Sequence, residues 1–228
     1  ITSIGEYAFQ NCTGLKSVSM GYNSTVEYTA EIDDWAFAGC TSLENVGLSE
    51  NVVTLGNYVF SDCSALTNLV LPESLTYMGY QMICGTAIES ITIPRNVKTS
   101  NHGYNGYSYE ERYYGALANC KTLNEVVFEE GMTAIPSYIL ASSDYTSYVN
   151  KVVIPESVTS IGSYAFYKNV NLNIASLPGK VKTIGNDAFK GCVKIENMSL
   201  PGSITSIGEY AFQNCTGLKS VSMGYNST

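Results

Sequence analysis

The chain is built from a recurring 23-residue arrangement of apolar and polar positions. Each unit begins with an anchor residue, apolar in all units but the one at Arg112. A small and a large apolar residue typically follow four and five residues later, as in Ile4, Ala8 and Phe9. An L-x-x-V-x-L run comes next, and apolar and polar residues alternate at its end, as at Val18 and Met20. Such alternation is typical of a short strand with one buried face. Each unit is therefore expected to contribute a strand.

The units are counted from their anchors, which lie at Ile4, Ile32, Leu55, Met78, Arg112, Ile135, Ile161, Ile184 and Ile207. Counted along the sequence, the steps between successive anchors are 28, 23, 23, 34, 23, 26, 23 and 23. The basic unit is therefore a 23-residue repeat, which three insertions of 5, 11 and 3 residues interrupt. Insertions in a stack of repeats form loops, which often carry the binding surface.

The rest of each unit predicts a second strand and several turns. The I-T-S-I segment up to the anchor also alternates and is a candidate second strand, and the glycine that often follows the anchor supplies a turn. The E-Y-A-F-Q-N segment then predicts a helical or 3₁₀ turn. Proline often closes the L-x-x-V-x-L run, where its missing N–H ends the strand.

Six of the seven cysteines occupy one slot of the repeat, at Cys12, Cys40, Cys63, Cys120, Cys192 and Cys215. A recurrence once per repeat matches no zinc pattern, and free cysteine is among the most buried residue types. We expect a ladder of buried thiols. Disulfides are the alternative, although parallel side chains on neighbouring rungs disfavour the dihedral angle that a disulfide needs.

A 23-residue unit cannot bury its own apolar face, whereas stacked units can. The sequence therefore predicts a β-rich α/β solenoid of about nine 23-residue coils, with short parallel strands on one face. Residues 1–25 and 204–228 are identical, letter for letter, at an offset of 203 residues. We interpret residues 1–228 as a single solenoid, an excerpt of a longer array with a 203-residue super-repeat.

The repeated signature IGxxAFxxCxxLxxVxLPxxV, as at Ile184-Gly185, Ala188-Phe189 and Cys192, resembles the BspA-like leucine-rich repeats, also called the Treponema pallidum type. The resemblance covers essentially the whole chain. It implies a leucine-rich repeat solenoid in a cell-surface or secreted protein, often one involved in adhesion to host or neighbouring cells. It brings no catalytic residues and no cofactor.

Charge and chemistry narrow the classes of function. The net charge of −8, from 12 Lys and Arg against 20 Asp and Glu, disfavours nucleic acid and anionic membranes as partners. No apolar run approaches the roughly 20 residues of a membrane-spanning helix. His102 is the only histidine, so a Ser-His-Asp or Cys-His arrangement would depend on one loop residue. We expect no catalytic site, no metal and no cofactor.

Tyrosine is concentrated in the insertions. The segment 100–114 carries Tyr104, Tyr107, Tyr109, Tyr113 and Tyr114 among Asn, Gly and Ser, and the three-residue insertion brings Tyr145 and Tyr148. This composition is that of antibody binding loops, in which tyrosine gives a large amphipathic contact area at low entropic cost. The sequence predicts ligand-binding loops at these seven tyrosines. The alternative is that they merely decorate the surface or pack on the rod.

Two sequons lie in the loop sequence G-Y-N-S-T, at Asn23 and Asn226, and are the candidate glycosylation sites of a eukaryotic source.

Two functions remain open. The first is a non-enzymatic cell-surface or secreted module that binds a protein or glycan on a host or neighbouring cell. The second is a structural segment of a long extracellular filament or sheath, in which copies associate end to end. An enzyme is the third alternative, and turnover in a hydrolase screen would reveal one.

Overall fold

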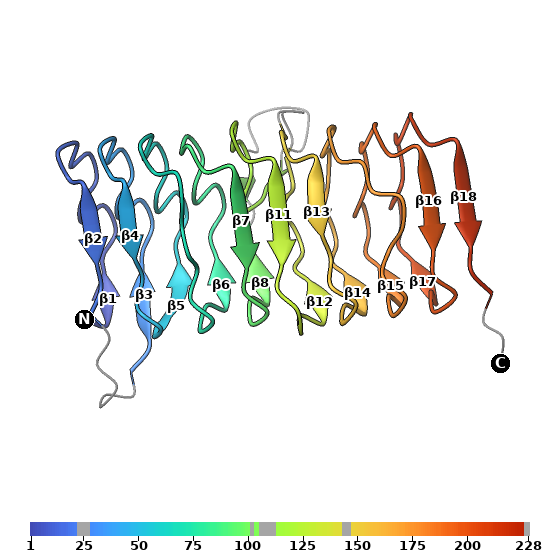
Figure 1. The fold of residues 1–228 in the computed structure, drawn as a ribbon, viewed down its shortest axis with the longest axis horizontal. Coiled ribbons are helices and arrows are strands. Elements are labelled where there is room, and N and C mark those ends of the chain that lie inside the picture. Colours follow the sequence, from blue (N-terminus) through green and yellow to red (C-terminus); the bar gives the residue numbers. More distant parts are fainter. Residues whose placement is uncertain (22–27, 101–102, 105–112, 143–146, 226–228) are drawn as a thin grey trace.

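The computed structural model describes residues 1–21, 28–100, 103–104, 113–142 and 147–225. These residues form a rod of nine stacked coils, with the two ends of the chain at opposite ends of the rod (Figure 1). The predicted β-rich solenoid is confirmed. No helix occurs among the described residues, so turns take the place of the helical element that the α/β expectation included.

One short strand per coil forms the anchor row. These strands are β1 (Ser3–Ile4), β3 (Ala30–Ile32), β5 (Val52–Leu55), β6 (Tyr77–Met78), β8 (Thr99–Ser100), β12 (Ala134–Ile135), β14 (Ser160–Ile161), β15 (Thr183–Ile184) and β17 (Ser206–Ile207). We number the coils 1 to 9 in this order. Neighbouring strands pair in parallel, except β8 and β12, between which the row is interrupted. The pairing places anchor beside anchor, as in Ile4 with Ile32 and Ile161 with Ile184. The I-T-S-I segment is therefore a strand, as the sequence indicates.

A second row of parallel strands comes from the L-x-x-V-x-L runs. Its members are β2 (Ser17–Ser19), β4 (Asn45–Gly47), β7 (Ser90–Ile93), β11 (Glu125–Phe128), β13 (Lys151–Val153), β16 (Asn197–Leu200) and β18 (Ser220–Met223). The pairing joins β2 to β4, β7 to β11 to β13, and β16 to β18. Two rows of strands thus enclose the core, and coils 3 and 7 add no strand to the second row.

The fifth anchor differs from the prediction. Its strand is β8, in which Thr99 and Ser100 pair with Tyr77 and Met78 of β6. Arg112 lies outside the described residues and twelve positions beyond this strand. The sequence comparison missed Ser100 because a serine replaces the usual Ile or Leu. The insertion therefore follows the anchor directly, and the antiparallel strands β9 (Gly103–Tyr104) and β10 (Tyr113–Tyr114) belong to it.

The E-Y-A-F-Q-N segment folds as consecutive turns because its N–H groups bond in two directions. The N–H groups of Tyr7 and Phe9 donate to Asp34 and Ala36 of coil 2, at 3.1 and 2.8 Å. The N–H groups between them stay within the coil, as in Ala8 to the carbonyl of Gly5 at 3.2 Å. A helix would need all of these donors for itself. Coil 9 has the same consecutive turns without a following coil, so the bonds within the coil also support this conformation.

Stacked side chains fill the core between the two rows. The large apolar residue of the A-F pair forms ladders in which successive rings lie 5.0 to 5.5 Å apart, as in Phe37 with Phe60 and Phe166 with Phe189. These four phenylalanines are fully buried. Coils 1 to 3 and coils 7 to 9 each add one ring to a column, whereas the corresponding pairs in coils 4 to 6 contain no aromatic residue. The core grows with the stack, as in other solenoids.

The cysteine slot provides a hydrogen-bond donor to the preceding coil. The thiols of Cys40, Cys63, Cys192 and Cys215 donate to a phenylalanine carbonyl of that coil at 3.1 to 3.2 Å. Burial raises the pKa of Cys63 to about 12, so this thiol keeps its proton. All seven cysteines are free, and five of them are buried. The expected ladder of thiols is therefore present, with Cys12 of coil 1 exposed.

Candidate functional site

The third residue after each anchor marks the turn at the edge of the rod. This residue has a positive φ in eight coils of the described chain, between 51° and 61°, at Tyr7, Trp35, Tyr58, Gln81, Tyr138, Tyr164, Asp187 and Tyr210. A large side chain in the left-handed region is uncommon and costs about 1–2 kcal/mol. In the seven of these coils that another coil follows, the N–H group of this residue donates to a carbonyl of that coil, as described above for Tyr7, whereas Tyr210 of coil 9 keeps the conformation without such a bond. The slot therefore places an aromatic side chain at the same position in six of the nine coils.

The aromatic side chains at this edge contact one another along coils 1 to 4. Trp35 stacks on Tyr58, with ring centroids 4.0 Å apart, and on Tyr7 at 6.4 Å. Tyr80 of coil 4 meets Tyr58 edge to face at 5.0 Å. Burial, together with the neighbouring tyrosines, raises the pKa of Tyr58 to about 12. These rings form a ladder that is half-buried, apart from the exposed Tyr7.

A second group of tyrosines, which we call the tyrosine edge, consists of Tyr113, Tyr138, Tyr164 and Tyr167. Tyr138 stacks on Tyr164, with centroids 4.8 Å apart and planes 5° apart. Tyr113, from the insertion, lies 4.8 Å from Tyr164 and 5.9 Å from Tyr167. The insertion strand β10 thus packs its tyrosine on tyrosines of coils 6 and 7. A bridge between Tyr114 and Ser142 attaches the same strand to coil 6.

Charged groups adjoin one side of the tyrosine edge. Burial and the carboxylate of Asp187, which accepts a hydrogen bond from the phenol, raise the pKa of Tyr164 to about 12, whereas a hydrogen bond from Tyr113 lowers it. Asp187 is buried and pairs with Lys190 at 2.8 Å. The Nζ atom of Lys190 lies 5.9 Å from the centre of the Tyr167 ring, within cation–π range. The half-buried Tyr113, Tyr138, Tyr164 and Lys190 therefore adjoin the buried Tyr167 and Asp187.

The predicted contact tyrosines fall into three groups. Tyr113 and Tyr114 are half-buried in β10, and Tyr148 is 44 % exposed. Tyr104 lies in β9, where its backbone pairs with that of Tyr113. The remaining predicted residues lie outside the described residues, namely Tyr107, Tyr109, Tyr145, Asn23 and Asn226.

Tyr138, Tyr164 and Tyr167 were not predicted, although they make most of the described tyrosine edge. They belong to the repeat itself rather than to an insertion. The signal was present in the spacing, since Tyr7, Tyr138 and Tyr164 all stand three residues after an anchor. The packing interpretation of the tyrosines therefore holds for Tyr113, whose ring lies on the rod.

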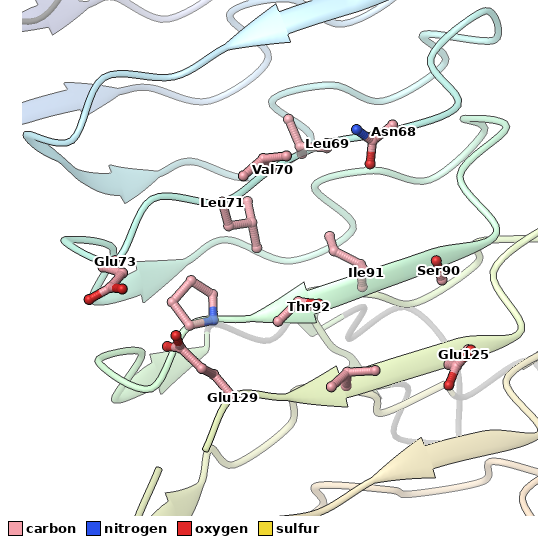
Figure 2. A pocket seen from close by; sticks show the side chains of 12 residues that line it. Asn68, Leu69, Val70, Leu71, Glu73, Ser90, Ile91, Thr92, Glu125 and Glu129 are labelled. Atoms are coloured by element: carbon pink, nitrogen blue, oxygen red, sulfur yellow. The ribbon is translucent and has the colours of Figure 1, made fainter. Parts of the chain in front are cut away.

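A groove opens in the second strand row, where coil 3 meets coil 4. Its volume is about 320 Å³, and its walls come from residues 68–71 of coil 3, from β7 and from β11. Figure 2 shows Val70 and Thr92 on neighbouring coils at this groove. Within the described chain, no backbone hydrogen bond joins residues 67–71 to the strands on either side. The groove therefore marks an interruption of the sheet.

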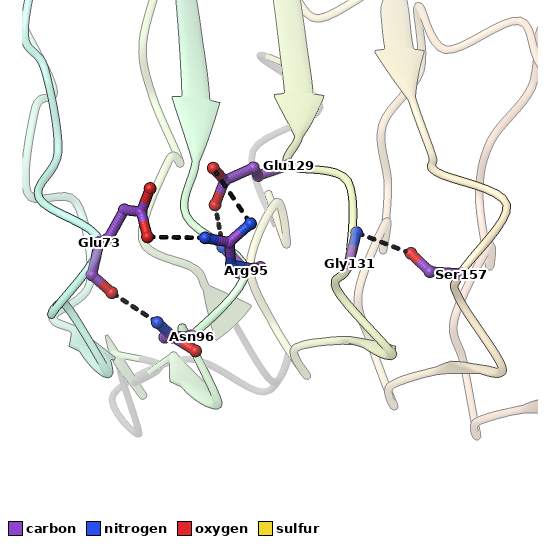
Figure 3. A network of polar contacts seen from close by, with 6 residues as sticks. All are labelled: Glu73, Arg95, Asn96, Glu129, Gly131 and Ser157. Carbon is purple, nitrogen blue, oxygen red and sulfur yellow. Dashed lines mark hydrogen bonds and ion pairs between the residues drawn. The ribbon is translucent and has the colours of Figure 1, made fainter.

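Polar contacts close one end of this groove across three coils. The guanidinium of Arg95 lies 2.7 Å from Glu73 and 3.9 Å from Glu129 (Figure 3). The side chain of Asn96 donates to the carbonyl of Glu73 at 2.8 Å. Arg95 thus offsets the charge of two rim carboxylates, which leaves the groove with an apolar character set by residues such as Val70 and Val127. Exposed ion pairs of this kind add little stability.

The described residues offer little for catalysis or metal binding. No group of three or more His, Cys, Asp or Glu side chains among them could hold a metal ion. His102 lies outside the described part of the chain. Among the described residues, no helix is long and apolar enough to cross a membrane. The features that could act chemically in the described region are therefore surfaces: the tyrosine edge and the groove.

Comparison with known proteins gives one family match. A family model described as the BspA type leucine rich repeat region matches residues 1–108 and 144–228 in six copies. No curated protein sequence matches the chain.

Several solved structures are similar to the chain. A leucine-rich repeat protein from Bacteroides ovatus is 22 % identical, with a TM-score of 0.46, over 96 % of this chain and 69 % of the other. A leucine rich cell surface protein from Faecalibacterium prausnitzii is 21 % identical, with a TM-score of 0.43, over 98 % and 76 %. The leucine rich repeat protein of T. pallidum is 21 % identical, with a TM-score of 0.40, over 96 % and 72 %.

Proposed function

The chain belongs to the BspA-type leucine-rich repeat family, and from this premise we propose that it is a non-enzymatic binding module whose contact surface is the tyrosine edge. Leucine-rich repeat domains generally mediate protein interactions, and solenoids present extended binding surfaces. The partner we propose is a protein or a glycan on a host or neighbouring cell. The extracellular or cell-surface location is the expectation that comes with the family.

The observation that carries the proposal is the packing of Tyr113 against Tyr138 and Tyr164. Stacking holds each ring in one orientation before any partner arrives, which reduces the entropy lost on binding. Tyrosine is enriched among the residues that dominate binding energy, because it offers both apolar area and a hydroxyl. The adjoining Lys190, which pairs with the buried Asp187 at 2.8 Å, adds polar recognition at the border of the edge.

The test compares two variants of the immobilised chain. Tyr138→Ala with Tyr164→Ala removes the edge, whereas Val70→Ser with Val153→Ser alters exposed residues of the second strand row and serves as the matched control. Proteins captured from cell-surface extracts are quantified by mass spectrometry, and the affinity of the most strongly captured one is then measured. We expect the edge variant to lose about 2 kcal/mol or more, near thirtyfold in Kd, and the control to bind as the unmodified chain does.

Removal of residues 101–112 distinguishes the contribution of the insertion to binding from that of the repeat tyrosines. The same capture is run with this deletion, and circular dichroism confirms that the edge variant and the deletion variant remain folded. Unchanged affinity of the edge variant would overturn the proposal. A loss shared equally with the Val70 and Val153 variant would move the contact surface to the strand row.

A second candidate function, a segment of an extracellular filament, is favoured by the identity of residues 1–25 and 204–228. A 25-residue sequence that recurs after 203 residues is typical of a long repetitive array. A chain that stays monomeric at every concentration tested would argue against this candidate.

A further inference from the structure

We propose that the groove between coil 3 and strand β7 binds a short extended peptide, whose main chain adds to the open edge of β7. This site is separate from the tyrosine edge and takes a different partner. Two features of the groove point to a peptide: main-chain groups that lack partners, and an apolar lining that ends in a negative charge.

The open edge of β7 is formed by the main chains of Ser90 and Thr92. On the other edge, β7 pairs in parallel with β11, and the N–H group of Glu129 donates to the carbonyl of Ile93 at 3.0 Å. Main-chain groups of successive strand residues point to opposite sides, so those of Ser90 and Thr92 face coil 3. Neither their N–H groups nor their carbonyls bond to any residue that the structure describes. The edge thus offers two donors and two acceptors at strand spacing, which an extended main chain matches.

Hydrogen bonds join the two walls of the groove at its ends. At one end, the N–H group of Ala87 donates to the carbonyl of Leu66 at 2.9 Å. At the other end, the side chain of Asn96 donates to the carbonyl of Glu73 at 2.8 Å. Between these contacts, residues 68–71 make no main-chain hydrogen bond within the described chain. This wall can therefore move aside for a ligand more easily than a bonded strand can.

The lining of the groove favours a β-branched side chain. Val70 is 69 % exposed, and the exposed Thr92 lies across the groove from it (Figure 2). A residue added along β7 places its outward side chain next to these two, and β-branched residues pack well on cross-strand neighbours. The volume of about 320 Å³ is at the lower end for small-ligand sites, so the groove suits a short segment.

One end of the groove carries an unbalanced negative charge. The carboxylates of Glu73 and Glu129 share the guanidinium of Arg95, at 2.7 and 3.9 Å, so one negative charge remains (Figure 3). At the other end, Glu125 pairs with Lys151 at 2.6 Å. A basic residue of the peptide therefore fits at the Glu73 end, which is the C-terminal end of β7. Because β7, β11 and β13 all pair in parallel, we expect the peptide to run in the same direction, with its basic residue at the C-terminus.

NMR titration of the ¹⁵N-labelled chain with the test peptide acetyl-Thr-Val-Thr-Val-Lys-amide measures this pairing directly. We expect saturable shifts and slower hydrogen exchange at the amides of Ser90 and Thr92, and no slowing at Ile91, which faces β11. A fully N-methylated peptide of the same sequence keeps the side chains but not the donors, and should bind at least about tenfold more weakly. The absence of saturable shifts at Ser90 and Thr92 would overturn the proposal.

Two substitutions of one residue separate main-chain pairing from side-chain contact. Thr92→Pro removes an N–H group that has no acceptor among the described residues, and proline is tolerated where the N–H group of an edge strand faces outward. Thr92→Val keeps the N–H group and the branched shape. We expect Thr92→Pro to weaken binding of the test peptide by about tenfold or more, and Thr92→Val to bind it as the unmodified chain does. Equal affinity of all three chains would show that side chains alone hold the peptide, which would overturn main-chain pairing.

The edge variant, Tyr138→Ala with Tyr164→Ala, distinguishes the groove from the tyrosine edge. It should bind the test peptide with unchanged affinity, because the groove lies on other coils. A loss of affinity in this variant, with Thr92→Pro unaffected, would place the peptide on the tyrosine edge and overturn the groove as its site.

Discussion

At the residue scale, one slot of the repeat shows that different residue types can make the same type of contact. Coil 7 has Asn169 where most coils have cysteine, and Asn169 is fully buried. Its Nδ2 atom donates to the carbonyl of Leu140 at 2.7 Å, which is the same type of contact that Cys63 makes to Phe37 at 3.2 Å. In these coils the slot therefore holds a small buried donor that reaches the preceding coil, whereas Cys120 donates to Ala118 of its own coil. A thiol is one solution and a carboxamide is another.

The donor role predicts a measurable loss at Asn169. Asn169→Ala leaves the buried Leu140 carbonyl without its partner, which should lower the free energy of unfolding by about 2–3 kcal/mol. Asn96→Ala is the control, since Asn96 makes a similar bond to Glu73 on the exposed surface and should cost less than about 1 kcal/mol. Urea unfolding of both variants gives the comparison. Equal losses would show that burial of this bond is unimportant.

Only some residues of the candidate site could be predicted from the sequence. The insertion tyrosines stood out by composition, and Tyr113 does lie in the tyrosine edge. Tyr138 and Tyr164 were missed because a tyrosine among polar neighbours reads as an ordinary surface residue. Their backbone is left-handed, at φ values of 61° and 57°, and their N–H groups donate to Ser163 and Asn186 of the next coil at 3.0 and 2.9 Å. No local pattern in one coil reports those bonds.

At the scale of elements, close approach of neighbouring coils explains the glycine that follows the anchor. A Cβ atom on Gly185 would lie 2.5 Å from the N atom of Ser163 in the preceding coil, and Gly162 is similarly close to Ser137. At the same slot of coil 1, Gly5 has no atom within 4 Å of such a Cβ. Glycine is therefore needed only where a coil precedes it, although the repeat places it in coil 1 as well.

Two alanine substitutions test this interpretation. Gly185→Ala should destabilise the rod by about 1–3 kcal/mol, because backbone atoms of coil 7 would have to move. Gly5→Ala should be neutral or slightly stabilising, since it only reduces the freedom of the unfolded chain. Thermal and urea unfolding of the two variants provide the measurement. If Gly5→Ala proved as harmful as Gly185→Ala, the glycine would serve the turn rather than the contact between coils.

The second strand row shows where element prediction from sequence succeeds and where it fails. Regular spacing, as at Val18 and Met20, predicted strands that the structure contains. In coil 7 the half-buried Ile174 and the buried Leu177 stand three residues apart, and Ala175 between them is exposed. The alternation slips by one residue there, and the strand is lost. The groove at coil 3 has no such signal, since burial alternates normally at Leu69, Val70 and Leu71.

At the scale of the whole molecule, stacking predicted the architecture correctly because each buried slot recurs in every coil. The repeat spacing alone indicated which residues face the core, and the structure buries Phe37, Phe60, Phe166 and Phe189 accordingly. The sequence of one unit does not indicate that its two sides differ in what covers them. The following coil, more than its own sequence, determines which apolar side chains of each coil are buried and which of its N–H groups are hydrogen-bonded.

The duplicated segment allows the most direct test of this claim, because one sequence occupies two environments. Amide hydrogen exchange is measured by NMR in dilute solution, since the two copies would yield peptides of identical mass. In coil 1 the N–H groups of Tyr7 and Phe9 bond to coil 2, whereas in coil 9 Gly208 bonds back to Ile184 at 2.8 Å. Slow exchange is predicted at Tyr7, Phe9 and Gly208, and fast exchange at their copies Tyr210, Phe212 and Gly5. The same protection pattern in both copies would contradict the account.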